Sequence, residues 1–192
     1  MEVVAYGDAS LGNVEKGRTQ GGRIVAIEDG TAAAAIVARS GQLRRVAHAS
    51  FDAETIIAVD TASDALGVAL TLDELKRGPS PSLLEKVMKR SQESGNHDPA
   101  GLLYPPTLFT DGNGTVQSVH GSKEPQSKRR QQDVYSLRES LALGDLKAVK
   151  WISTDKNPAD VLTKAKSPDA PESKVFHDLV YQGKPPPKQQ ED

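Results

Sequence analysis

The feature that most constrains the fold is a short apolar segment near the N-terminus that runs directly into a carboxylate. Residues 3–6 are Val-Val-Ala-Tyr, and Gly7 and Asp8 follow them. β-Branched and aromatic residues favour a buried strand, so we expect a core strand that ends near Asp8. In open α/β sheets, ligands bind at the carboxyl ends of the strands. The fold should therefore bring further charged side chains to Asp8.

The composition narrows the class of protein. The chain has 192 residues, no cysteine and a formal net charge of −2. Its length fits one domain with appendages, and the lack of cysteine excludes disulfides and thiolate metal sites. We see no membrane-spanning run and no signal-peptide pattern, so we expect an intracellular protein that is not secreted and has no membrane partner. The near-neutral charge argues against a polybasic binder but allows a local basic patch beside an acidic metal site.

A β-hairpin is expected after the first strand. Residues 23–28 form the second predicted strand, and Asp29 with Gly30 is a hairpin turn signal. Residues 32–38 return as a third strand, although their alanines also fit a helix. A basic connector over residues 39–45 follows.

A long helix is expected over about residues 51–72, with Ser50 as its N-cap. Its apolar residues form two stripes, so we expect it to pack between a sheet and other helices. The narrow solvent face carries Asp60 and Asp64. Glu54 lies in the first turn, on the stripe of small residues that can approach the sheet most closely.

The C-terminal half alternates short strands with helices. A strand over residues 107–110 ends in Asp111, again a carboxylate. The other expected elements are a helix from about Gly112 to His120, a helix that follows Lys128–Arg130 and stops at Gly144, a strand over 147–152 with Trp151 in the core, a helix from Asn157 and Pro158 with Asp160 in its first turn, and a short helix near 175–181.

These elements predict one domain over residues 1–166 and a C-terminal extension over residues 167–192. The domain contains an irregular, flexible insertion at about residues 76–104. The extension begins with the short helix and ends in a proline-rich, polar tail that we expect to be disordered.

The element order suggests how carboxylates meet. A strand–helix–strand crossover is almost always right-handed and places its two strands parallel. If the strands ending at Asp8 and Asp111 are neighbours, their carboxylates lie on strands about 4.8 Å apart and need cations to stay ionised. Glu54 and Asp160, each in a first helical turn, can reach the same edge. For any single Asp at a strand end, a turn or capping role is the more common alternative.

An all-oxygen ligand set of this kind suits Mg²⁺ or Mn²⁺. Two such ions about 3.5–4 Å apart are a usual apparatus for hydrolysing phosphodiesters. The chain has 26 acidic residues, so the spacing alone is a weak signal, and local sequence has to support it.

The local sequence supports the metal site, because it resembles the ribonuclease H domain of copia-type LTR retrotransposon polyproteins. The matches run in the family's order from about residue 3 to residue 166, and the Ala-Asp-Val-Leu-Thr-Lys signature at 159–164 is the most specific. The matching segments are Tyr-Gly-Asp-Ala-Ser at 6–10, Gly-Gly-Arg-Ile-Val at 21–25, residues 43–55 with Ser50, Ala53 and Glu54, Phe-Thr-Asp at 109–111, Lys-Trp-Ile at 150–152, and residues 157–164.

The resemblance implies an α/β ribonuclease H-like fold, with a five-stranded mixed sheet of three antiparallel strands followed by two parallel ones, flanked by helices. It implies a metal-dependent endonuclease that cleaves the RNA strand of RNA/DNA hybrids with two Mg²⁺ ions, for which Mn²⁺ can substitute. Asp8 would bridge both ions, Glu54 and Asp111 would hold the ion at the leaving oxygen, and Asp160 would hold the ion that activates water. The implied partner is an upstream reverse transcriptase domain of the same polyprotein.

Five further residues are candidate contacts to the hybrid. Arg18, Arg44 and Arg45 carry charge that suits phosphates, although a solvated surface charge is the commoner role for each. Asn113 can reach a 2′-hydroxyl or the minor groove, with helix capping as an equal alternative. Ser50, at the start of the long helix, completes the set.

Two other classes of function compete with the nuclease. A catalytically decayed or non-catalytic module would keep the fold and bind a polymerase domain or nucleic acid without cutting. An integrase of the same superfamily fits less well, because integrases carry their last acid as a Glu on a late helix, whereas Asp160 lies within Ala-Asp-Val-Leu-Thr-Lys.

Overall fold

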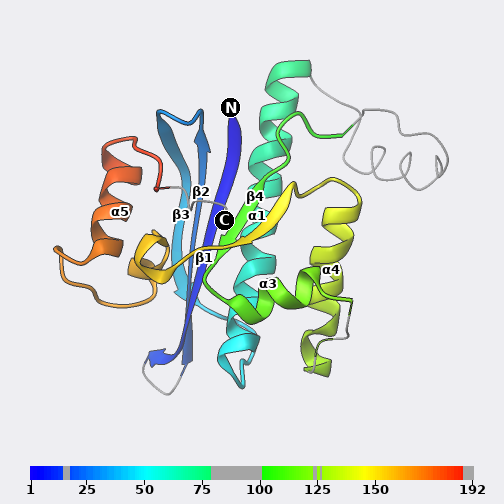
Figure 1. Cartoon of the computed structure of the whole chain (residues 1–192), viewed down its shortest axis with the longest axis vertical. Helices are drawn as coiled ribbons and strands as arrows, with labels where there is room; N and C mark the ends of the chain where they lie inside the picture. The colour runs from blue at the N-terminus through cyan, green and yellow to red at the C-terminus, as the bar shows by residue number, and fades with distance from the viewer. Residues whose placement is uncertain (15–17, 79–100, 123–124, 126, 188–192) are drawn as a thin grey trace.

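The computed structural model describes residues 1–14, 18–78, 101–122, 125 and 127–187. One five-stranded sheet runs through the molecule, with helices on both faces (Figure 1). Its order is β3-β2-β1-β4-β5. The strands are β1 (Glu2–Val14), β2 (Arg18–Glu28), β3 (Ala33–Gln42), β4 (Thr107–Thr110) and β5 (Ala148–Trp151).

The pairing is the mixed pattern that the sequence predicts. β1, β2 and β3 are antiparallel, and β4 and β5 run parallel to β1. The helices are α1 (Ser50–Arg77), α3 (Asn113–His120), α4 (Gln131–Ala142) and α5 (Pro171–Tyr181), with 3₁₀ turns η2 (Lys128–Arg130), η3 (Thr154–Lys156) and η4 (Asp160–Leu162).

The hairpin strands are longer than expected, and this changes the place of Asp8. β1 continues to Val14, so Asp8 lies inside the strand, opposite Gly22 of β2. β4 is short and ends at Thr110, opposite Gly7. The expectation that β1 ends at Asp8 is therefore wrong. The sheet edge next to Asp8 is made by the end of β4.

The third strand is β3, so the alternative of a helix over its alanines is wrong. β3 extends to Gln42 and absorbs most of the expected basic connector, because Arg39 pairs with Arg23 in the register with β2. The side chains of β3 are largely exposed, as is usual for a strand at the edge of a sheet.

Each face of the sheet has its own core. α1 and α4 cover one face, where Val3, Ala5 and Val25 pack against alanines of α1. On the opposite face, α5 and η4 cover the alternate residues of the same strands, and Leu179 of α5 is fully buried there. The second core contains Val4, Tyr6, Ile24, Ala26, Ile152, Ala159 and Leu179.

α1 is the long helix that the sequence predicts, but Ser50 is not its cap. The N-cap is Ala49, without a side-chain hydrogen bond, and Ser50 is the first helical residue. Asp52 instead accepts a hydrogen bond from the backbone N–H of His48 at 3.1 Å. A carboxylate in the first turn that reaches back to the preceding chain stabilises the helix start in place of a serine cap.

Among the described residues, α1 is also the one helix long and apolar enough to cross a membrane by length and composition. The expectation that the sequence has no run of membrane-spanning length does not hold for this segment. In the fold, its small residues Ala58, Ala62, Ala65 and Ala69 are buried in the core on the sheet, which explains its apolar composition.

The C-terminal half contains two further corrections. The expected helix after Asn157 is only the turn η4, with Asp160 as its first residue. Trp151, expected in the core, is 44% exposed because it is the last residue of β5.

Two expectations concern the insertion and the tail. Most of the insertion, over residues 79–100, and the last five residues lie outside the described residues. Before them, Pro186 is buried, so the tail packs against the fold at least to this point. The division at residue 166 remains a prediction.

Candidate metal centre and nucleic-acid interface

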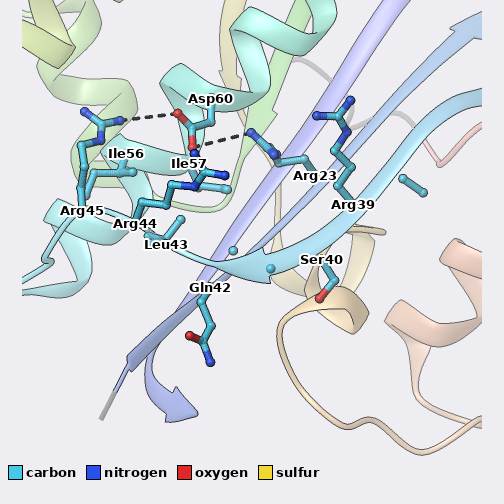
Figure 2. A pocket seen from close by; sticks show the side chains of 13 residues that line it. Arg23, Arg39, Ser40, Gln42, Leu43, Arg44, Arg45, Ile56, Ile57 and Asp60 are labelled. Carbon is cyan, nitrogen blue, oxygen red and sulfur yellow. Dashed lines mark ion pairs between the residues drawn. The ribbon is translucent and has the colours of Figure 1, made fainter. Parts of the chain in front are cut away.

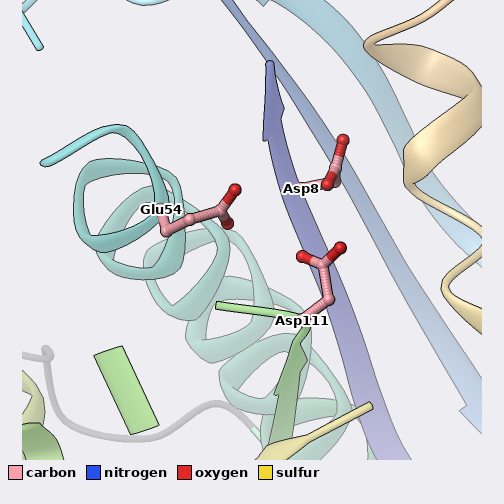
Figure 3. A group of neighbouring side chains, drawn as sticks. All are labelled: Asp8, Glu54 and Asp111. Carbon is pink, nitrogen blue, oxygen red and sulfur yellow. The ribbon is translucent and has the colours of Figure 1, made fainter. Parts of the chain in front are cut away.

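Three of the four predicted carboxylates come together at the end of β4. Asp8 comes from β1, Glu54 from the first turns of α1, and Asp111 follows the last residue of β4 (Figure 3). One oxygen from each lies within 4.8 Å of the other two. The strand register explains the meeting of the two aspartates, because Gly7 pairs with Thr110 and their next residues are Asp8 and Asp111.

Glu54 reaches this point because the chain after β4 comes unusually close to α1. A Cβ atom on Gly112 would lie 2.9 Å from the Cβ of Glu54. A side chain at position 112 would therefore push the loop away from α1. The backbone N–H of Ala9 also acts on the Glu54 carboxylate and lowers its pKa, against the larger effect of burial.

Asp111 is held from several sides. Its Oδ2 accepts a hydrogen bond from the Thr154 hydroxyl at 2.8 Å. Its carbonyl oxygen accepts hydrogen bonds from Nε1 of Trp151 at 3.1 Å and from the backbone N–H of Asn113 at 2.9 Å. These contacts fix the loop, and Oδ1 of Asp111 takes no part in them.

Burial and mutual repulsion raise the pKa values of Glu54 and Asp8. Burial, followed by the charges of Asp111 and Asp8, raises the pKa of Glu54 to about 9. Burial also raises the pKa of Asp8 to about 6, with Asp111 and Asp160 adding to the effect and Thr163 and Lys164 opposing it. Buried carboxylates that lie this close together need a proton or a cation to compensate their charge.

The cluster fits a divalent cation. Oε2 of Glu54 and Oδ1 of Asp111 are buried and have no hydrogen-bond partner among the described residues. Carboxylate oxygens without histidine or thiolate are the donor set of hard cations such as Mg²⁺ and Mn²⁺. Asp8, Glu54 and Asp111 are therefore the residues that would hold such an ion.

Asp160 is not in the group of oxygens that all lie within 4.8 Å of one another, although its charge acts on Asp8. Its Oδ1 forms an ion pair with Lys164, and its Oδ2 lies 2.8 Å from Nζ of Lys166. Asp160 is fully buried. Nζ of Lys164 also lies 3.9 Å from Oδ2 of Asp8, so an ammonium group stands between the two aspartates.

Several residues of the site were not predicted. The Thr163 hydroxyl donates a hydrogen bond to Oδ2 of Asp8. Asn157 is fully buried, and its Nδ2 donates to the carbonyl oxygen of Gly7 at 3.1 Å, which ties η4 to β1. Thr163 and Lys164 stand inside the signature at 159–164, so the signal was present, but only Asp160 was interpreted.

Two of the three predicted arginines, Arg44 and Arg45, line a cavity of about 770 Å³ beside α1 (Figure 2). Arg45 lies 2.6 Å from Asp133 and 3.6 Å from Asp60, and Arg23 also lies 3.6 Å from Asp60. Arg44 is exposed and forms no ion pair with a described residue. Arg44 is thus the arginine of this group whose charge is most available to a phosphate.

The remaining predicted contacts are all exposed. Ser50 starts α1, and Asn113 starts α3 without making the alternative side-chain cap, because the N-cap is Gly112. Arg18 lies in β2 and donates a hydrogen bond to Oε1 of Gln42 at 2.8 Å. No observation in the structure links these three residues to a ligand.

Comparison with known proteins supports the fold. No protein-family profile and no curated protein matches the sequence, but solved structures match the architecture. The N-terminal RNase H domain of a Mycobacterium tuberculosis protein, solved as a fusion with maltose binding protein, covers 84% of this chain and 95% of its own, at 14% identity and a TM-score of 0.50. An RNase H1 isolated from compost by a metagenomic approach covers 91% of this chain and 98% of its own, at 12% identity and a TM-score of 0.52.

With its sheet order of β3-β2-β1-β4-β5 and helices on both faces, the chain has the ribonuclease H fold.

Proposed function

We propose that this protein is a divalent-metal-dependent ribonuclease that hydrolyses the RNA strand of RNA/DNA hybrids. The observation that carries the proposal is the group of Asp8, Glu54 and Asp111, whose oxygens lie within 4.8 Å of one another. The group lies on a ribonuclease H fold, and the two structures compared above bear the name RNase H.

The residues of the site have distinct parts in this chemistry. Asp8, Glu54 and Asp111 hold Mg²⁺, with Mn²⁺ as a substitute, and the bound cation supplies charge neutralisation at the phosphodiester and a more acidic water. Thr154 and Trp151 orient Asp111, and Thr163 orients Asp8. Arg44 and Arg45 contribute positive charge for the phosphate backbone, whose contacts position the duplex.

The finer assignment follows from the sequence resemblance. We place the chain as the ribonuclease H domain of a copia-type retrotransposon reverse transcriptase, with an upstream polymerase domain as its partner. An element of that kind replicates inside the cell, so we propose a cytoplasmic particle or the nucleus as its location. Asp160, the fourth acid of the family pattern, belongs to this assignment as the ligand of a second cation.

The test is cleavage of a labelled RNA/DNA hybrid in Mg²⁺ by the full chain. The wild-type protein should shorten the RNA strand, and Asp8→Asn should abolish cleavage because the substitution removes a charged ligand from the centre of the group. Asp155→Asn is the matched control, since Asp155 is exposed on η3 and its loss should leave the activity unchanged. A wild-type protein that cuts no hybrid in Mg²⁺ or Mn²⁺ contradicts the proposal and favours a non-catalytic module.

A further inference from the structure

Two ammonium groups fill the Asp160 side of the carboxylate site. Lys164 pairs with Oδ1 of Asp160 and lies 3.9 Å from Oδ2 of Asp8. Lys166 lies 2.8 Å from Oδ2 of Asp160, and 3.0 Å from Oε1 of Glu172 at the start of α5. Both oxygens of Asp160 are therefore paired with lysines.

The other side of the site is different. Oε2 of Glu54 and Oδ1 of Asp111 are buried and have no hydrogen-bond partner among the residues that the structure describes. Oδ2 of Asp160 also has no hydrogen-bond partner there, but it lies 2.8 Å from Nζ of Lys166. Because Asp160 has ion pairs with two lysines, whereas Glu54 and Asp111 have none with a described residue, the carboxylates divide into a half without a compensating cation, at Glu54 and Asp111, and a half compensated by lysine, at Asp160. Asp8 lies between the halves.

The position of Lys164 follows from the local chain. Lys164 follows η4, four residues after Asp160, and its backbone N–H donates a hydrogen bond to the carbonyl oxygen of Asp160 at 3.2 Å, so its side chain returns to the carboxylate one turn back. Asp8 and Asp160 are 1% and 0% exposed, and buried carboxylates require a compensating charge. An ammonium group attached to the chain competes for this place at a high effective concentration.

We propose that Lys164 is a tethered cation between Asp8 and Asp160, so that the free protein binds one divalent cation, at Asp8, Glu54 and Asp111. A second divalent cation enters only when Lys164 moves away. The inference rests on the proposed metal-dependent function. It identifies Lys164 as a positioning residue that sets how many cations the site holds.

Nucleic acid provides a route for this displacement. The Lys164 side chain is 33% exposed, and a lysine has a flexible four-carbon stem. It can therefore turn from the carboxylates toward a phosphate of a bound strand. Substrate and the second cation would then bind together.

The experiment is a Mn²⁺ titration of the full chain without nucleic acid, followed by calorimetry and by electron paramagnetic resonance. The wild-type protein should bind one Mn²⁺. Lys164→Met should bind two, with a magnetically coupled pair and a gain of about tenfold or more in the second affinity, tenfold being about 1.4 kcal/mol. Two ions in the wild-type protein, or one ion in Lys164→Met, overturns the inference.

Two control variants separate charge from position. Lys164→Arg keeps a cation in place and should bind one Mn²⁺. Lys147→Met removes the same charge from an exposed lysine that pairs with Glu2, and it should also bind one. If Lys147→Met gained the second ion, net charge rather than the place of Lys164 would explain the result.

Thermal unfolding covers the case in which Lys164→Met folds poorly. Lys164→Met removes one partner from buried carboxylates, so its unfolding temperature in EDTA should be lower than that of the wild-type protein. Mn²⁺ should raise the unfolding temperature of Lys164→Met by more than it raises that of the wild-type protein. A loss that Mn²⁺ does not restore contradicts the inference.

Cleavage is not needed for any of these measurements, so the two proposals fail separately. One Mn²⁺ without cleavage of hybrid contradicts the function alone. Cleavage with two Mn²⁺ in the free wild-type protein contradicts the role of Lys164 alone.

Discussion

At the residue scale, the backbone determines how deeply the three carboxylates are buried and how close together they lie. Glu54 is forced close to Asp111 by the contact of α1 with Gly112, and Asp8 is buried beneath Thr163. The raised pKa values of Glu54 and Asp8 show that burial disfavours the charged forms of these carboxyl groups without a cation. A divalent ion removes that cost, which couples metal binding to stability and to pH.

This coupling predicts that stability without divalent ions falls as the pH rises. Glu54 has a pKa of about 9 in the folded protein against a usual 4.5, so between these values the folded state binds more protons than the unfolded state. The free energy of unfolding should then decrease with rising pH, because a rise in pH favours the state that binds fewer protons. Each unit of pKa difference corresponds to about 1.4 kcal/mol. Urea unfolding in EDTA across this range measures the slope.

Glu54→Gln is the variant that isolates the effect. It cannot ionise, so above about pH 6, where the contribution of Asp8 also ends, its stability should be nearly independent of pH. The same slope in Glu54→Gln and in the wild-type protein would show that another group causes the decrease.

Single residues were predicted unevenly from the sequence. Asp8, Glu54 and Asp111 stand beside apolar segments, so their position in strands and helix was readable. Lys164 stands four residues after Asp160, a spacing that the sequence shows, whereas the pairing of Lys166 depends on η4 being a single 3₁₀ turn rather than a helix. The prediction that Trp151 lies in the core is wrong because the exposure of Trp151 depends on where β5 ends.

At the scale of elements, the contact between β2 and η4 holds the Asp160 turn against Asp8. Gly22 lies opposite Asp8, and a Cβ on Gly22 would come within 2.6 Å of the carbonyl oxygen of Ala159 and 2.8 Å of Cβ of Leu162. A contact this short with a backbone atom can be relieved only if the chain itself moves, which is energetically costly. The absence of a side chain at Gly22 is therefore what allows η4 to lie on the sheet.

Gly22→Ala should destabilise the protein by about 1–3 kcal/mol, the usual cost of overpacking. Gly41→Ala, in β3, is the control, since a Cβ there meets nothing within 4 Å and should change stability little. Denaturant midpoints of the two variants provide the comparison. Equal midpoints would mean that η4 moves freely and does not hold Asp160 in place.

The elements themselves were largely predictable, and their ends were not. Turn residues and apolar patterns predicted all five strands and the long helix. The lengths of β1, β2 and β3 depend on cross-strand pairing over the hairpin, which local sequence does not encode. In the same way, the local sequence predicts Ser50 as the N-cap of α1, whereas Ser50 is the first helical residue.

At the scale of the whole molecule, α5 belongs to the packing that supports the site. Leu179 is fully buried in the second core with Tyr6 and Ile24, and Glu172 of α5 pairs with Lys166, which pairs with Asp160. The sequence predicted a short helix here but gave no sign that it covers a face of the sheet. Its role depends on tertiary contacts with residues more than a hundred positions away.

Leu179→Ala should therefore cost about 2–5 kcal/mol, as for other buried leucines. Leu75→Ala is the matched control, because Leu75 on α1 is 77% exposed and exposed substitutions usually change stability by less than about 0.5 kcal/mol. Chemical denaturation of both variants tests this. A small effect of Leu179→Ala would show that α5 is dispensable to the fold.

The proposed function is tested most directly by asking which strand is cut, and with which cation. An RNA/DNA hybrid is labelled on each strand in turn and incubated with the wild-type protein in EDTA and in Mg²⁺, beside Asp8→Asn. The expected result is a shortened RNA label and an intact DNA label, only with Mg²⁺ and only with the wild-type protein. Cleavage in EDTA, cleavage by Asp8→Asn, or no cleavage under any condition would contradict a metal-dependent ribonuclease centred on Asp8, Glu54 and Asp111.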